Sequence, residues 1–231
     1  MFIRLLFFLF FINAGICLSQ NCLDTILHRE PYSSSNDIIN GKKWTYEKKY
    51  SGSSILTGDY WTEAAISYCG VVYKKVLVNY DVIKNEIIIY YPEKGKEKYL
   101  VLNTDHLTGF SFSDSLLKRN RFFEYVELPG IKGKNLYENA SAGKISFYVK
   151  PIKKLVIGSS GLGGGAYDSY YEYFLYAGTY YSGFQSKKQF IRYLGTYGSE
   201  ANRFIKKNRL KINNQNPENI ITVISYLGRL K

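Results

Sequence analysis

Residues 71–82 read VVYKKVLVNYDV, and residues 86–91 read EIIIYY after a Lys84-Asn85 turn. Aromatic and β-branched side chains alternate with polar ones in the first run, as they do in a half-buried strand. Two such runs joined by a short polar turn are typical of neighbouring antiparallel strands. This stretch therefore predicts a β meander and makes a sheet the basis of the fold.

Further strand patterns lie on both sides of this meander. The chain contains 23 Tyr and 14 Phe, and aromatic residues suit pleated, half-buried surfaces. We expect one predominantly antiparallel sheet, for which a roll, a barrel and an open curved sheet all fit the pattern. The additional expected strands are 44–46, 99–102, 122–128, 145–149, 154–157 and 170–177.

Residues 186–231 change from a strand pattern to a helix pattern. Ser186 and Gln189 form a capping box, and Asn216-Pro217-Glu218 combines a cap, a proline at the first helical position and an early acid. A further helix is expected after Ser199. Helices this short are marginal in isolation, so two or three of them must pack on the sheet. The predicted fold class is mainly β with C-terminal helices (α+β).

The N-terminal segment has the composition of a secretory signal peptide. Arg4 precedes an uninterrupted apolar run over residues 5–12, and Ser19 supplies a small residue at the expected cleavage site. The run is shorter than the ~20 residues that a membrane-spanning helix requires. We expect export to the periplasm, the outer-membrane periphery or the extracellular space, without a transmembrane segment after cleavage. An uncleaved anchor and a lipoprotein are the alternatives.

The expected organisation has four parts. Residues 1–19 are the signal peptide, and residues 20–41, which contain a run of serines, are a weakly ordered lead-in. Residues 42–185 form the antiparallel β domain, and residues 186–231 form the short helices that pack on it.

The chain is strongly basic, with a formal net charge of +12, which falls to about +11 when Arg4 leaves with the signal peptide. A cytosolic protein of this charge would suggest nucleic acid, which export makes an unlikely partner. The remaining candidates are an anionic envelope polymer, lipid headgroups or an acidic protein. Net charge also favours solubility without any partner.

The bases concentrate on the expected C-terminal helices. At about 100° per residue, Ala201, Phe204 and Ile205 share one side of their helix, so the bases project from the other. This spacing predicts a patch for an anionic partner, with a merely solvated helix face as the alternative. The patch consists of Lys188, Arg192, Arg203, Lys206 and Lys207.

Cys22 and Cys69 are the two cysteines that remain after removal of residues 1–19. Disulfides persist in the compartments to which export leads. We therefore predict a bond between them that ties the lead-in to the sheet. The alternative is a buried Cys69 thiol and a free Cys22.

Two short patterns match hydrolase chemistry. Ser115 and Lys118 have the Ser-x-x-Lys spacing, in which the lysine takes the serine proton, and Asp105 precedes His106. Companion motifs are missing from the sequence, so a turn and a surface histidine are the plain alternatives. No residues have the spacing of a zinc site, and the glycine-rich residues 158–166 lack the βαβ context of a dinucleotide site. No cofactor is therefore expected.

A tyrosine-rich segment offers a further binding surface. Its rings suit stacking on sugars, whereas cross-strand packing is the structural alternative. Phe174 and Leu175 point to opposite faces of the expected strand, which favours burial. The tyrosines are Tyr167, Tyr170, Tyr171, Tyr173, Tyr176, Tyr180 and Tyr181.

The chain resembles a group of exported β-rich proteins of Bacteroidota-type bacteria, for which no activity is established. The resemblance rests on residues 78–81 entering a hairpin, the glycine-rich loop and residues 204–211. It implies export and the order of sheet before helices. The expected function is a non-catalytic binding or structural role in the cell envelope. A small envelope hydrolase and a glycan-binding module are the alternatives.

Overall fold

The computed structural model describes residues 42–44, 51–58, 60–93, 95–157, 165–176, 178 and 181–230. The expected signal peptide (1–19) and lead-in (20–41) lie outside these residues. Trp44 is described and lies just after the first strand, whereas the rest of the strand expected at 44–46 lies outside.

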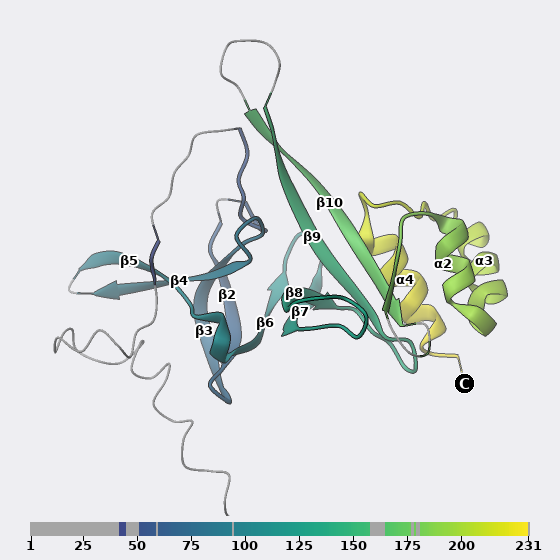
Figure 1. Cartoon of the computed structure of the whole chain (residues 1–231), viewed down its shortest axis with the longest axis horizontal. Coiled ribbons are helices and arrows are strands. Elements are labelled where there is room, and N and C mark those ends of the chain that lie inside the picture. Colours follow the sequence, from purple (N-terminus) through teal and green to yellow (C-terminus); the bar gives the residue numbers. More distant parts are fainter. Residues whose placement is uncertain are drawn as a thin grey trace, which may run out of the picture.

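The described residues form one antiparallel sheet of eleven strands (Figure 1). The order across the sheet is β1-β5-β4-β3-β2-β6-β7-β8-β9-β10-β11, so the sheet is open and not a closed barrel. The strands are β1 (Lys42–Lys43), β2 (Thr62–Tyr68), β3 (Val71–Asp81), β4 (Glu86–Glu93), β5 (Lys96–Val101), β6 (Leu107–Asp114), β7 (Arg119–Val126), β8 (Asn135–Asn139), β9 (Phe147–Ile157), β10 (Gly165–Tyr176) and β11 (Tyr181–Phe184).

Three α-helices follow the sheet, which confirms the predicted fold class. They are α2 (Lys187–Tyr193), α3 (Gly198–Lys207) and α4 (Pro217–Leu227), and short 3₁₀ turns occupy η1 (Thr104–His106) and η2 (Gly195–Tyr197). The Ser186 hydroxyl accepts from the Gln189 amide at 3.3 Å, and the Asn216 side chain accepts from the Glu218 amide at 3.0 Å. Both caps are those that the sequence predicts. None of the described helices has the length and apolarity needed to cross a membrane.

Tight turns set the register of the meander. The β2–β3 hairpin turns at Cys69 and Gly70, whose φ angles are +50° and +77°. Two successive residues with positive φ match the twist of flanking strands in a two-residue hairpin, and glycine tolerates this conformation without strain. Asn85, with φ +55°, helps to turn β3 into β4 as the sequence predicts.

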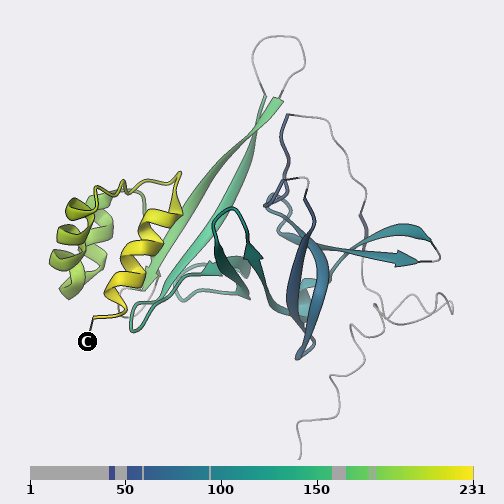
Figure 2. The same ribbon diagram turned by 180° about the vertical axis from the view of Figure 1, so that it is seen from behind.

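One face of the sheet carries two separate hydrophobic clusters. The first lies on β2–β8 and includes Ile66, Tyr80 and Phe123. The second lies on β9–β11, where Phe147 and Tyr173 pack beneath the three helices. Figure 2 shows that the helices gather at this end of the sheet and leave the β2–β5 end uncovered by helix.

Buried charges separate these two clusters. On β7 and β8, Arg121 donates two hydrogen bonds to Oε2 of Glu138, from Nε at 3.1 Å and from Nη2 at 2.7 Å. The Arg119 guanidinium forms an ion pair with the other Glu138 oxygen, at 2.5 Å, and also binds Glu218 on α4. This cluster therefore joins the sheet to the first turn of α4.

The opposite face of the sheet has its own smaller cluster of Leu128, Tyr137 and Phe174. Leu175, the next residue after Phe174, belongs to the cluster beneath the helices. The prediction that these neighbours point to opposite faces is therefore confirmed.

Strand β9 joins two runs that the sequence suggests as separate strands, 145–149 and 154–157, across Pro151. Pro151 pairs with Tyr171, whose amide donates outward to the Asn214 carbonyl at 2.8 Å. The backbone nitrogen of Pro151, opposite Tyr171, therefore also points away from β10. It faces the side where the pairing between β8 and β9 has already stopped, at Glu138 and Val149. A proline is tolerated there because no ladder hydrogen bond is lost.

Candidate functional site

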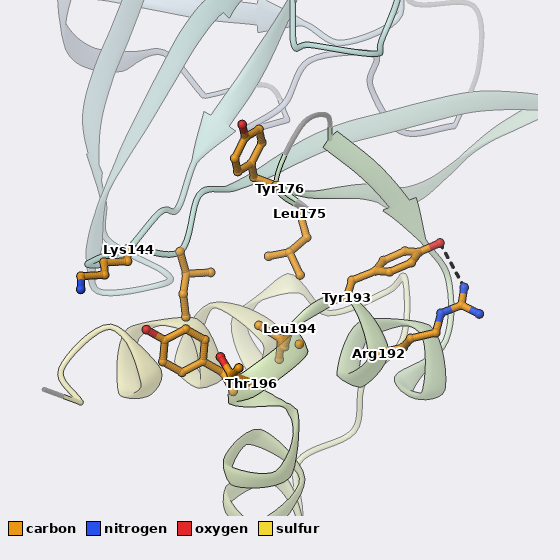
Figure 3. A pocket seen from close by; sticks show the side chains of 11 residues that line it. Lys144, Leu175, Tyr176, Arg192, Tyr193, Leu194 and Thr196 are labelled. Carbon is orange, nitrogen blue, oxygen red and sulfur yellow. Dashed lines mark hydrogen bonds between the residues drawn. The ribbon is translucent and has the colours of Figure 1, made fainter.

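A pocket of about 420 Å³ lies where the base of the β9–β10 hairpin meets α2 and η2 (Figure 3). Its residues come from the 142–145 turn, the end of β10 and the α2–η2 junction. The eleven lining residues are Lys144, Ile145, Leu175, Tyr176, Gly178, Arg192, Tyr193, Leu194, Gly195, Thr196 and Tyr197.

The floor of the pocket is apolar. Ile145, Leu175 and Leu194 are buried and belong to the cluster that joins the helices to the sheet. Because they are also core residues, their positions are fixed by the packing of the whole C-terminal region. The pocket is therefore built on a rigid base.

Lys144 is held at one end of the pocket by a tight turn. Ala142 and Ile145 exchange backbone hydrogen bonds of 2.9 and 3.0 Å around it. Gly143, with φ +57°, approaches the end of α4 so closely that an added Cβ would lie 2.6 Å from the Gly228 carbonyl oxygen. This contact docks the turn on α4 and positions the exposed lysine.

Arg192 lies at the other end of the pocket (Figure 3). Its guanidinium carbon lies 5.0 Å from the centre of the Tyr193 ring, and Nη2 donates to the Tyr193 hydroxyl at 3.3 Å. A guanidinium has five N–H donors, so this one hydrogen bond leaves most of them available to a ligand. The tyrosine therefore orients the cation without neutralising it.

Three tyrosines complete the lining, namely Tyr176, Tyr193 and Tyr197. Tyr193 and Tyr197 are half-buried, whereas Tyr176 is 42% exposed at the rim. Figure 3 shows the Tyr176 ring directed away from the helices. Together the rings provide both flat apolar surfaces and hydroxyl groups.

The tyrosine-rich segment divides between core and surface. Tyr173 is buried against Phe147 and Phe184, and burial raises the pKa of its hydroxyl. Tyr181 packs on Tyr148 on the opposite face. Tyr180 lies outside the described residues. Among the described tyrosines of this segment, Tyr176 is the one that lines the pocket.

The predicted basic patch is exposed on the surfaces of α2 and α3. Lys188, Arg192, Lys206 and Lys207 are exposed, and within the described residues none of the four forms an ion pair. We call these four residues the basic face.

Arg203 differs from the other patch residues because it pairs with Glu200 at 2.6 Å. The Tyr226 hydroxyl also donates to Glu200, and this hydrogen bond, followed by that from Arg203, lowers the pKa of the Glu200 carboxyl. Tyr226 in turn stacks on Phe204 with ring centres 4.0 Å apart. Glu200 and Phe204 therefore link α3 to α4 through Tyr226, and the charge of Arg203 is already compensated by Glu200.

The residues of the hydrolase alternative lie on exposed turns. Ser115 and Lys118 form part of the β6–β7 turn, in which the Asp114 carboxylate accepts from two backbone amides. His106 closes η1 and lies edge-on to Tyr68. Asp105 and His106 are both exposed, and none of these four residues lines the pocket. The structure thus brings no support to the hydrolase alternative.

Cys69 is disulfide-bonded. Its predicted partner, Cys22, lies outside the described residues, so that pairing stays a prediction. Residues 158–164 of the glycine-rich segment also lie outside. They connect the antiparallel strands β9 and β10, which excludes the strand-to-helix context of a dinucleotide site.

The part of the chain that the structure describes contains no group of three or more His, Cys, Asp or Glu side chains suited to a metal ion. Comparison of the chain with protein-family models, curated proteins and solved structures gives no match. Within the described residues, the pocket and the basic face are therefore the two structural features that indicate a function.

Proposed function

We propose that this chain is an exported, non-catalytic binding component of the cell envelope, which docks on an anionic polymer through its basic face. The observation that carries the proposal is the exposure of Lys188, Arg192, Lys206 and Lys207 on two adjacent helices. The N-terminal sequence supports export, and the net charge of +12 supports attraction to anionic surfaces.

The arrangement of the basic face favours binding over a purely structural role. The helices that carry it are fixed to the sheet by buried residues such as Phe190, Ala201 and Ile205. The bases are thus presented by a rigid support, while the one acid between them, Glu200, is engaged by Arg203 and Tyr226. A partner meets positive charge that the protein itself does not neutralise.

The test compares Lys206→Glu/Lys207→Glu with the matched control Lys132→Glu/Lys134→Glu. Lys132 and Lys134 are exposed on the β7–β8 loop, where Ile131 packs against the face opposite the helices. Each double variant changes the net charge equally. The first should weaken binding to polygalacturonate about 30-fold or more, since a base near an anionic surface contributes ~1 kcal/mol.

Binding should also weaken steeply with added salt, because exposed charges are screened over ~8 Å at physiological ionic strength. Anionic phospholipid vesicles form a parallel arm that detects docking on headgroups instead of a polymer. An equal loss of polyanion affinity in both double variants would mean that net charge, and not the position of the bases, determines binding. That result would contradict docking through the basic face. Absence of salt-sensitive binding to any polyanion would refute the proposal.

A further inference from the structure

We propose that the pocket between Lys144 and Arg192 binds a short segment of an acidic polysaccharide. Lys144 and Arg192 contact carboxylates on different sugar residues, while Tyr193 and Tyr197 pack against the sugar rings. This inference deepens the proposed function, on which it rests for the anionic character of the partner.

The charge of the lining selects an anionic ligand. Lys144 and Arg192 are both exposed, and the eleven lining residues include no aspartate or glutamate. Arg192 is already oriented by the hydrogen bond and ring contact with Tyr193. A carboxylate that approaches it therefore meets donors whose conformational freedom is already reduced.

The separation of the two cations selects a ligand with spaced charges. Lys144 and Arg192 occupy opposite ends of the pocket, with the apolar side chains of Leu175 and Leu194 between them (Figure 3). A single phosphate or sulfate would be held best by cations that converge on one point. Cations at two ends instead match a chain whose units each carry a charge.

The floor distinguishes a sugar chain from an acidic peptide. Ile145, Leu175 and Leu194 present no polar side-chain groups, whereas an extended peptide needs partners for its backbone amides and carbonyls. Sugar rings have apolar C–H faces that pack on leucine and tyrosine side chains. Their hydroxyl groups pair with solvent and with polar groups of the lining, which include the Thr196 hydroxyl.

The dimensions fit a segment and not a whole polymer. A volume of about 420 Å³ lies within the ~300–1,000 Å³ range of ligand pockets. Gly195 and Thr196 are exposed along one side, so the pocket stays open to solvent there. The rest of a chain bound here can continue over α2 toward Lys188, which lies one helical turn from Arg192.

The test uses tetragalacturonic acid as the probe and isothermal titration calorimetry as the measurement. Lys144→Met and Arg192→Met remove one charge each and should weaken binding about tenfold. Tyr197→Leu removes a ring surface and should weaken binding about fivefold. The matched controls are Lys132→Met and Tyr60→Leu, since both side chains are exposed outside the pocket.

Neutral cellotetraose and poly-glutamate complete the set of probes. The proposal requires tetragalacturonic acid to bind more tightly than either, with pocket variants weakened and controls unchanged. It is overturned if Lys144→Met and Tyr197→Leu bind as wild type does, or if poly-glutamate binds as tightly through the same residues. If the wild-type protein does not bind tetragalacturonic acid but still binds polyanions through the basic face, the pocket proposal is wrong and the proposed function stands.

Discussion

Replacement of Glu138 by methionine should destabilise the fold by about 3–5 kcal/mol, the cost of removing one partner from a buried ion pair. The Glu138 side chain is 1% exposed and that of Arg121 is 6% exposed, so water reaches neither charge freely. Without Glu138, the nearest described counter-charge of Arg121 is Asp114, at 3.4 Å. Arg119 keeps its two hydrogen bonds to Glu218, so the loss falls mainly on Arg121.

Urea unfolding of the purified protein, followed by its intrinsic fluorescence, measures this cost. At an m-value of about 3 kcal/mol/M, the unfolding midpoint should fall by roughly 1 to 1.7 M. The double variant Arg121→Met/Glu138→Met removes both charges and should recover most of the loss. Its new apolar side chain on β7 would pack where the Arg121 guanidinium now lies, 5.1 Å from the ring centre of Phe123.

Glu63→Met is the matched control, because Glu63 is exposed on β2. Its free energy of unfolding should change by no more than about 0.5 kcal/mol. The reasoning is wrong if Glu138→Met costs less than about 1 kcal/mol. It is also wrong if the double variant costs the sum of the two single variants, since that result would show no coupling between the charges.

Two further predictions concern the pocket turn and the core. Gly228→Ala should displace the 142–145 turn, because an added Cβ would lie 2.6 Å from the Ala142 Cβ; we expect lower thermal stability and shifted amide resonances at Lys144. Burial, followed by the charge of Asp81, raises the pKa of Tyr80, so this hydroxyl stays protonated in the folded state when the unfolded state ionises. The stability it contributes is complete below about pH 10 and falls by up to about 1.4 kcal/mol per pH unit above it. Tyr80→Phe should therefore flatten the loss of stability in urea titrations between pH 10 and 11.5, and an unchanged slope would contradict this assignment.

The sequence predicts the meander and the helices because local signals specify them. The run from Val71 to Asp81 has both strand composition and turn residues at its ends, and the Ser186 and Asn216 caps mark helix starts. Local patterns do not predict strands β2, β6, β8 and β11. Gly109 in β6 illustrates the reason, since an added Cβ there would lie 2.1 Å from the Phe123 carbonyl oxygen. The close approach of β7 leaves no room for a side chain at this position, so glycine is required there. Glycine is uncommon inside strands, and its presence therefore weakens the strand pattern in the sequence.

The candidate site is only partly predictable for a similar reason. The basic residues of α2 and α3 follow from helical spacing, which is local. The buried ion cluster depends on the β7–β8 register and on the approach of Glu218, which is 99 residues from Arg119 in the chain. The pocket likewise joins Lys144 to residues 175–178 and 192–197 through tertiary packing. A local sequence pattern does not indicate which residues that are far apart in the chain become neighbours in the fold.

The pocket and the basic face depend on the same packing, which determines how their functions can be separated. Leu194 and Phe190 anchor α2 in the core, and the same helix presents Lys188 and Arg192 to solvent. A variant that loosens α2 would abolish binding both in the pocket and on the basic face, so it could not show which of the two surfaces binds a given ligand. Informative changes therefore alter exposed side chains and leave the anchors intact.

Lys144 contributes to the pocket from the sheet side, whereas Lys206 and Lys207 contribute to the basic face from α3. Because these positions lie on different elements, their effects on binding should be close to additive if two surfaces act independently. Strong coupling between Lys144→Met and Lys206→Glu/Lys207→Glu would instead mean that one continuous ligand spans both surfaces.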